Sequence, residues 1–348
     1  MNRLASLAAA GAGAYLAYRY LWPGYDYRDK HAVVTGGCRG LGLVLARELA
    51  ARGARVSVCA RDPVEVASAS EEFEARGVPA VAVECDVTDQ DRVKEFLAVA
   101  RQKHGPVDVL INNAGIIGVG PLEEQRIEDF ELALRTHLWA SLYTALDVIP
   151  EMKARRSGRI VNITSFGGKV AVPHLLPYIA SKFAQVGLSD GLRVELARFG
   201  VTVTTVCPGL MRTGSHRQAT FKGQHEKEYR WFALGAAFPL LSMSAEAAAR
   251  QILRGVALGD AEIVLTLPAQ LAVLARAVAP GLVYKLAALA DRFILPEPGG
   301  VGPRSVKGAD SRGRTPDLLT AHIDRASERN NELVPGVPVP PPLPSPAS

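Results

Sequence analysis

The chain has 348 residues, of which 48% are hydrophobic and 22% charged. That is enough for one large α/β domain with additional segments, or for two small domains. The formal net charge is +5, and the densest basic stretch, residues 153–159, contains no aromatic residue, so we expect a solvated turn and no nucleic-acid partner. The four cysteines lack metal-ligand spacing, which predicts free buried thiols in a reducing compartment and no bound metal.

Residues 1–28 form an apolar N-terminal segment in which we expect a membrane anchor. Residues 4–22 are mostly small and apolar, and at ~1.5 Å per residue a helix of this length approaches the ~30 Å core of a bilayer. Aromatic residues cluster at its far end, as in an interfacial belt, and more basic residues follow the run than precede it, which predicts a membrane-associated protein with its catalytic domain on the cytoplasmic side. A cleaved signal peptide and a helix packed on the protein's own core remain the alternatives.

Residues 29–268 alternate apolar strand-like runs with helical patterns. This alternation predicts an α/β domain with a Rossmann-like, doubly wound parallel sheet of about seven strands. The expected strands are His31–Thr35, Arg55–Ala60, Ala80–Cys85, Val107–Asn112, Arg159–Ser165, Val201–Cys207 and Glu262–Leu267. The clearest helical patterns are Leu41–Arg52, Glu65–Arg76, Asp89–Lys103 and Phe130–Lys153.

Two further segments follow the predicted sheet domain. Residues 269–295 form an apolar helical hairpin, Ala269–Val278 and Leu282–Phe293, interrupted at Pro280 and Gly281. It either packs on the sheet domain or serves as an interfacial or lid element beside an apolar site. Residues 296–348 are rich in Pro, Gly, Ser and charge, which predicts a disordered tail with one short helix near Leu318–Arg329.

A glycine-rich turn, residues 35–42 (T-G-G-C-R-G-L-G), follows the first predicted strand and leads into a helix. Glycines permit a tight turn and a close backbone approach to a pyrophosphate, whose charge is favourable at a helix N-terminus. The strand–turn–helix context therefore indicates a dinucleotide site at Gly36, Gly40 and Gly42.

The end of the second predicted strand indicates which dinucleotide binds. An NAD site usually has an acidic residue there to hold the ribose 2′-hydroxyl, and this chain has Ala60. Arg61 and Arg39 supply guanidinium groups that suit a 2′-phosphate. We therefore expect NADP(H) in preference to NAD(H), although the acidic Asp62 lies one residue further on.

A third pattern combines Ser165, at the end of a predicted strand, with Tyr178 and Lys182 on the next helix. Residues four apart share one helix face, so the phenol and the ammonium can converge on one ligand. A nearby ammonium favours the phenolate and lowers the pKa of a tyrosine. Ser165 can hydrogen-bond a carbonyl oxygen on which charge develops.

Taken together, these patterns resemble the short-chain dehydrogenase/reductase family from about Asp29 to Leu267. The resemblance also rests on Asp86-Val87, on Asn112-Asn113-Ala114-Gly115, and on Pro208-Gly209 with Thr213. It implies that Tyr178 is the general acid/base, that Lys182 lowers its pKa and that Ser165 orients the substrate. It also implies a cofactor site made of Gly36, Cys38, Arg39, Gly40, Leu41, Gly42, Arg61, Asp86, Val87, Asn113, Ala114, Gly115, Tyr178, Lys182, Pro208, Gly209 and Thr213.

His137 is a departure from the family pattern. It lies where the family usually has an asparagine that holds a water in a proton relay to the lysine. A histidine can both donate and accept a hydrogen bond, so His137 either carries the relay as a fourth catalytic residue or merely fills the position.

The expected function is an NADP(H)-dependent oxidoreductase that interconverts a ketone or aldehyde and an alcohol on a lipophilic substrate at a membrane. The lipophilic part rests on the N-terminal segment, the hairpin, and the aromatic residues between Met211 and Leu241, which are Phe221, Tyr229, Trp231, Phe232 and Phe238. A cofactor-binding scaffold with weakened catalysis and a soluble reductase of small polar carbonyls are the alternatives. The sequence leaves the oligomeric state open, although the family that it resembles commonly forms dimers and tetramers through the helices that carry residues like Tyr178.

Overall fold

The computed structural model describes residues 24–238, 242–313 and 325–332, together with Ala17, Leu21, Trp22 and Ile323. Within this part of the chain, seven strands form one sheet in the order β11-β7-β6-β4-β1-β2-β3, and every pair in it is parallel. The strands are β1 (His31–Thr35), β2 (Arg55–Ala60), β3 (Ala80–Glu84), β4 (Val109–Asn112), β6 (Gly158–Ile163), β7 (Val201–Cys207) and β11 (Glu262–Val264). The predicted Rossmann-like sheet is confirmed.

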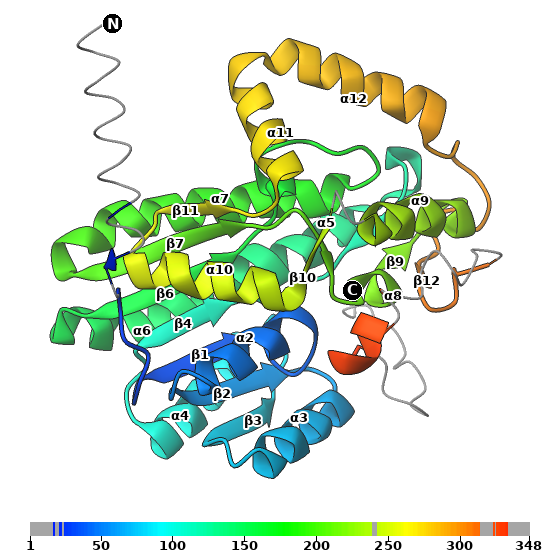
Figure 1. Cartoon of the computed structure of the whole chain (residues 1–348). Coiled ribbons are helices and arrows are strands. Elements are labelled where there is room, and N and C mark those ends of the chain that lie inside the picture. Colours follow the sequence, from blue (N-terminus) through cyan, green and yellow to red (C-terminus); the bar gives the residue numbers. More distant parts are fainter. Residues whose placement is uncertain are drawn as a thin grey trace, which may run out of the picture.

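Helices cover both faces of the sheet (Figure 1). Side chains of α2 (Gly40–Ala50), α3 (Pro63–Ala75) and α10 (Ala245–Leu258) belong to one hydrophobic core. Those of α4 (Gln90–His104), α6 (Ala140–Arg155) and the end of α7 (Leu176–Leu196) belong to the other. Successive residues of a strand point to opposite faces, and β1 shows this, because Ala32 and Val34 lie in the first core and Val33 in the second.

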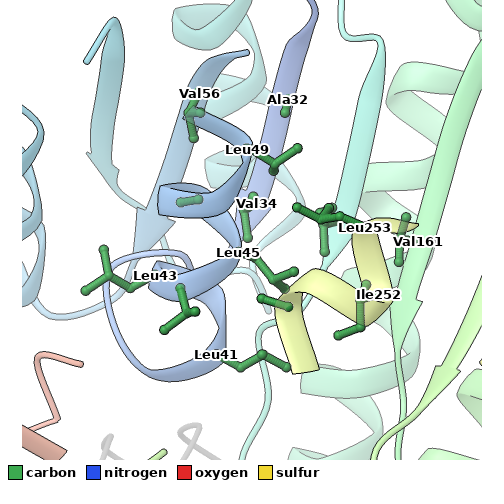
Figure 2. Packing of buried hydrophobic residues seen from close by; sticks show 14 of the residues in the cluster. Ala32, Val34, Leu41, Leu43, Leu45, Leu49, Val56, Val161, Ile252 and Leu253 are labelled. Carbon is green, nitrogen blue, oxygen red and sulfur yellow. The ribbon is translucent and has the colours of Figure 1, made fainter. Parts of the chain in front are cut away.

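Packing between α2 and the sheet fixes the N-terminus of α2, where the glycine-rich turn leads into the helix. Leu43, Leu45 and Leu49 are fully buried in this core, where Leu45 lies between α2 and α10, Leu49 lies near β1 and Leu43 points to the opposite side of α2 (Figure 2). Burying each leucine stabilises the fold by about 1.5–3 kcal/mol. The turn is therefore held between a buried strand and a buried helix.

Shorter elements follow the carboxyl ends of the strands. They are β5 (Gly118–Val119), β8 (Leu210–Arg212), β9 (Thr220–Phe221), β10 (Ser242–Ser244), α5 (Ile127–Leu134), α8 (Ser215–Gln218) and α9 (His225–Ala237). Single turns of other helix types occur at η1 (Leu122–Glu124), η2 (Arg135–Trp139), η3 (Phe166–Gly168) and η4 (Ala197–Phe199). Four of the five aromatic residues of the 211–241 region lie in a third apolar cluster around β9 and α9, and Phe238 is exposed.

The predicted helical hairpin consists of α11 (Leu267–Val278) and α12 (Pro280–Ile294). It projects from the sheet domain (Figure 1), and Ala269 is its only buried residue. Its exposed large apolar side chains are Leu267, Leu271, Leu274, Val278, Leu282, Tyr284, Leu286, Leu289, Phe293 and Ile294. The hairpin therefore presents an uncovered apolar surface.

The region after Pro296 differs from the expected disordered tail wherever the structure describes it. Strand β12 (Val306–Lys307) pairs antiparallel with β9, and Gly308 N donates to the Ala219 carbonyl at 2.8 Å. Residues 325–329 are helical, within the predicted range. Composition missed this order because the bonds join segments far apart in the chain.

The predicted membrane anchor lies almost entirely outside the described residues. Among the residues that the structure does describe, no helix is both long enough and apolar enough to cross a bilayer. The four cysteines are free and buried, as predicted.

Candidate active site

The glycine-rich turn joins β1 to α2 with little room for side chains. Gly36 and Gly40 have φ angles of +61° and +54°, a region that favours glycine. A Cβ on Gly42 would lie 2.1 Å from the Gly36 carbonyl oxygen. Asn113 braces the turn, because its Nδ2 donates to the carbonyls of Thr35 and Gly36 at 3.1 and 3.0 Å. The glycines are therefore needed for the conformation and the internal packing of this turn.

Other predicted cofactor residues contribute backbone or structural contacts. The side chains of Cys38, Leu41 and Val87 are buried in the two cores. Asp86 forms a turn by accepting from the Thr88 N–H and hydroxyl at 2.9 and 2.8 Å. Ala114 N donates to the Thr35 hydroxyl at 3.2 Å. A Cβ on Gly115 would lie 3.1 Å from His137 Nε2.

Charged side chains of both signs gather beside the end of β2. Arg61 is exposed there, and Arg39 reaches the Glu65 carboxylate at 3.3 Å. Burial lowers the pKa of Lys307 on β12, and the charges of Arg39 and Arg61 lower it further. Lys307 therefore lies within range of the charges of the two predicted arginines, and also of Asp62 and Glu65, which act to raise its pKa.

The last described residues lie directly on the glycine-rich turn (Figure 1). Arg39 Nη1 donates to Glu332 Oε2 at 3.0 Å, and Gly40 N donates to the Asn330 carbonyl at 2.8 Å. Asn331 Nδ2 donates to the Cys38 carbonyl at 2.9 Å. Burial raises the pKa of Glu332 to about 7, although Arg39 acts to lower it. Arg39, predicted to hold a cofactor phosphate, is thus paired with carboxylates here.

Ser165, Tyr178 and Lys182 come together at the ends of β6 and the start of α7, as the sequence predicted. Burial raises the pKa of Tyr178 to about 12, while a hydrogen bond with Ser165 lowers it. Ser165 Oγ also accepts from Gly167 N at 3.0 Å, which fixes the serine. Gly167 packs beside both residues, and a Cβ there would make ordinary contacts, 3.4 Å from Ser165 Oγ and 3.5 Å from Tyr178 Cε1.

Lys182 is almost completely buried, with 4% of its surface exposed. Its Nζ lies 5.8 Å from the centre of the Tyr178 ring and donates to the Ile163 carbonyl and to Gln185 Oε1, both at 3.0 Å. Burial lowers the pKa of Lys182 to about 7. We expected the ammonium to lower the pKa of Tyr178. In this structure burial favours the neutral form of both groups instead.

His137 lies in the π-helical turn η2 and is fully buried. Its Nε2 accepts from Ile116 N at 3.1 Å. Ser181 Oγ donates to the Tyr178 carbonyl, so its 2.7 Å bond to His137 Nδ1 requires the imidazole to donate there. Burial lowers the pKa of His137 well below 6.5, and the Lys182 charge lowers it further. The ring is therefore neutral, with both nitrogens engaged.

Residues 208–213 follow β7 and border the same site. The Pro208 carbonyl accepts from Phe166 N at 2.9 Å, which ties this loop to Ser165. A Cβ on Gly209 would lie 2.2 Å from Thr266 Oγ1, so glycine is required for this close approach. Thr213 is buried, and its hydroxyl accepts from Ser215 N at 3.2 Å.

Comparison with known proteins identifies the family. The family described as short chain dehydrogenase matches residues 30–223. The chain belongs to the short-chain dehydrogenase family. It is accordingly an oxidoreductase that acts on CH–OH groups.

Individual members of the family are similar over the sheet domain. A Streptomyces violaceoruber protein named as a ketoacyl reductase of the granaticin polyketide synthase is 42% identical over 184 residues, or 52% of this chain and 68% of its own. A crystal structure of an actinorhodin polyketide ketoreductase variant with NADPH is 34% identical with a TM-score of 0.62, covering 68% of this chain and 95% of its own. A gluconate 5-dehydrogenase from Burkholderia cenocepacia, solved with NADP and tartrate, is 26% identical with a TM-score of 0.60, covering 69% of this chain and 96% of its own.

Four further polar residues lie beside the sites that the sequence predicts. Gln185 accepts a hydrogen bond from Lys182 and donates one to Ser141. Lys307 and Glu332 lie beside the glycine-rich turn. The first two are ordinary polar residues on amphipathic helices. The other two fall in a segment whose composition is typical of disorder. No local pattern marks any of them.

Proposed function

We propose that this short-chain dehydrogenase is an NADP(H)-dependent reductase that interconverts a carbonyl and an alcohol on a lipophilic substrate at a membrane. The proposal that it is a working enzyme rests above all on the convergence of Ser165, Tyr178 and Lys182 where β6 leads toward α7. The choice of substrate rests on the exposed apolar hairpin.

The side chains divide the chemistry between them. Tyr178 gives a proton to the carbonyl oxygen in reduction and takes it back in oxidation, as a general acid/base. Ser165 donates a hydrogen bond to the same oxygen and stabilises the charge that develops on it. Lys182 favours the phenolate form of Tyr178 when it carries its charge.

The residues fit a bound NADP(H). Gly36 and Gly40 allow the left-handed backbone of the turn, which is of the kind that a pyrophosphate approaches closely, and the N-terminus of α2 favours its charge. Arg39, Arg61 and Lys307 supply cations for a 2′-phosphate. The structural relatives with NADPH and NADP support the same choice. When bound, the nicotinamide supplies or accepts the hydride.

The hairpin supports the lipophilic substrate and the membrane. The hairpin has three basic side chains, Arg276, Lys285 and Arg292, and a single acidic one, Asp291. Asp291 Oδ1 lies 3.2 Å from His174 Nε2. His174 is four residues before Tyr178, so α12 is joined to the loop beside the active site. An apolar surface with a positive charge balance suits the interface of an anionic bilayer.

The test is NADPH consumption by detergent-solubilised full-length protein on matched long-chain and short polar ketones, with Tyr178→Phe as control. The proposal predicts turnover of a long-chain ketone that the variant abolishes. Turnover of polar ketones alone would refute the lipophilic substrate and leave a reductase of small carbonyls. Tight NADPH binding without turnover would instead favour a cofactor-binding protein.

A second measurement tests the hairpin. Leu274→Asp with Leu282→Asp is expected to lower kcat/KM for a long-chain ketone delivered in anionic vesicles by about tenfold, since two apolar side chains leave the interface. The same variant should not change kcat/KM for that ketone's short-chain analogue in solution. Equal kcat/KM values in vesicles for the variant and the natural chain would refute the membrane role.

A further inference from the structure

The buried ammonium of Lys182 has one side-chain hydrogen-bond acceptor, which is Gln185. Gln185 is fully buried, and its Oε1 accepts from Lys182 Nζ at 3.0 Å. The other acceptor, at the same distance, is the backbone carbonyl of Ile163. An ammonium that has lost its hydration is costly unless it is paired or hydrogen-bonded. Gln185 is therefore the acceptor of the Lys182 ammonium that a substitution can remove, because the other acceptor is a backbone carbonyl.

Gln185 is itself held in one orientation by Ser141. Gln185 Nε2 donates to Ser141 Oγ at 2.9 Å, and Ser141 Oγ donates to the His137 carbonyl at 2.7 Å. Because an amide nitrogen only donates and an amide oxygen only accepts, this bond turns the Gln185 oxygen toward Lys182. A chain of hydrogen bonds through Gln185 and Ser141 thus joins Lys182 to the backbone of the π-helical turn.

We propose that Gln185 is a positioning residue, which holds the Lys182 ammonium in the place and charge state that proton transfer at Tyr178 requires. The inference rests on the proposed function and adds a residue to it. Gln185 touches neither substrate nor cofactor and acts only through Lys182.

The groups around Lys182 show why a neutral acceptor matters. The titratable groups that face it are Tyr178, His137 and Cys207. Burial keeps all three neutral at pH 7, raising the pKa of Cys207 to about 11 and lowering that of His137. No anion among them offsets the ammonium, so the loss of the Gln185 acceptor would lower the pKa of Lys182 below about 7.

The test is the pH dependence of alcohol oxidation by the full-length protein. With Gln185→Met, Lys182 loses its charge more easily and the phenolate of Tyr178 is less favoured. We expect the rising limb of the pH–rate profile to move to a pH about one unit higher, which makes alcohol oxidation about tenfold slower at neutral pH. With Gln185→Glu, the added negative charge should move the limb in the opposite direction.

Ser189→Ala is the matched control, because Ser189 lies one turn further along α7 and bonds Asn162 and Thr205 instead. It removes a buried polar group and should leave the limb in place. Unmoved limbs in both Gln185 variants, or equal shifts in all three, would refute the positioning role. If Tyr178→Phe retained activity, the proposed function would fail and this inference with it.

A separate set of contacts concerns residues 325–332, the C-terminal segment. Three of its residues bond the glycine-rich turn, and Glu332 is 5% exposed. A Cβ on Gly40 would lie 2.5 Å from Glu332 Oε1. Arg47 further fixes the segment by donating to the Arg329 carbonyl at 3.0 Å. A carboxylate thus lies at the N-terminus of α2, where an anion is favoured.

The segment and a dinucleotide need the same groups. The Asn330 carbonyl takes the Gly40 N–H, which a pyrophosphate at this helix end would use. Glu332 takes the Arg39 guanidinium, which would otherwise meet the 2′-phosphate. Both sets of contacts cannot form together. We infer that the C-terminal segment competes with NADP(H) for the glycine-rich turn and must leave before the cofactor binds.

Competition of this kind lowers apparent affinity by the fraction of molecules in which the turn is free. Glu332→Ala should weaken the segment and lower the Kd for NADPH about fivefold to tenfold, which is the effect expected on losing a buried charge-assisted hydrogen bond. Glu328→Ala is the matched control, since Glu328 lies in the same segment and is exposed. It should not change the Kd.

Hydrogen exchange on the natural chain gives an independent readout. NADPH should speed amide exchange in residues 325–332, because the segment is displaced. Slower exchange with NADPH would show that the segment closes over the cofactor and would refute the inference. So would equal Kd values for Glu332→Ala and the natural chain. If none of the proteins bound NADPH, the cofactor assignment would fail and this inference with it.

Discussion

His137 is predicted to stabilise the fold without carrying a proton. The ring is fully buried, its Nδ1 bonds Ser181 at 2.7 Å, and its Nε2 accepts from Ile116 N at 3.1 Å. His137→Ala would leave the Ile116 N–H without its acceptor and open a cavity. Together these changes should lower the free energy of unfolding by about 3–5 kcal/mol. His137→Asn can keep an acceptor and should cost less.

The pH dependence of stability tests the protonation state. Burial lowers the pKa of His137 well below 6.5, so below pH 6.5 the unfolded chain binds a proton that the folded chain does not. Stability from this group is therefore present above pH 6.5 and is lost as pH falls. One such group loses about 1 kcal/mol between pH 6.5 and pH 5.5.

Urea unfolding of the natural chain and of His137→Asn at pH 7.5, 6.5 and 5.5 measures this contribution. The quantity to compare is the difference in the free energy of unfolding between the two proteins, because His31 and His104 also have lowered pKa values and are present in both. The difference should shrink by about 1 kcal/mol between pH 6.5 and 5.5. A constant difference, or a pH–rate profile altered by His137→Asn, would refute this reasoning and favour a proton relay through the ring.

Three further predictions follow from the site and the core. Tyr178→Phe should lower kcat about 10²–10⁴-fold while leaving the Kd for NADPH within about twofold; retained turnover would remove the phenol from the proton transfer. Lys307→Ala should raise the Kd for NADPH about fivefold to tenfold and leave the Kd for NADH unchanged, whereas equal effects on both cofactors would argue against a 2′-phosphate contact. Leu45→Ala, in the fully buried cluster of Figure 2, should lower the free energy of unfolding by about 2–5 kcal/mol in urea titrations, and a loss below 1 kcal/mol would contradict the packing there.

The sequence by itself determined the sheet, the glycine-rich turn and the Ser165/Tyr178/Lys182 set. These features are local, because apolar periodicity defines strands and helices, glycines mark the turn, and a spacing of four places two side chains on one helix face. Parallel strands then bring their carboxyl ends to one edge. Local chemistry was therefore enough to predict that these residues lie together at one edge of the sheet.

Only the tertiary structure decided which partners those residues have. Gln185 and Ser141 are 44 residues apart, and Arg39 and Glu332 are 293 apart, so no sequence pattern links them. Burial likewise set the charge states, because the pKa values of Tyr178, Lys182 and Glu332 depend on surroundings assembled from distant segments. A residue's type is written in the sequence, but its solvation and its hydrogen-bond partners arise only when the chain folds.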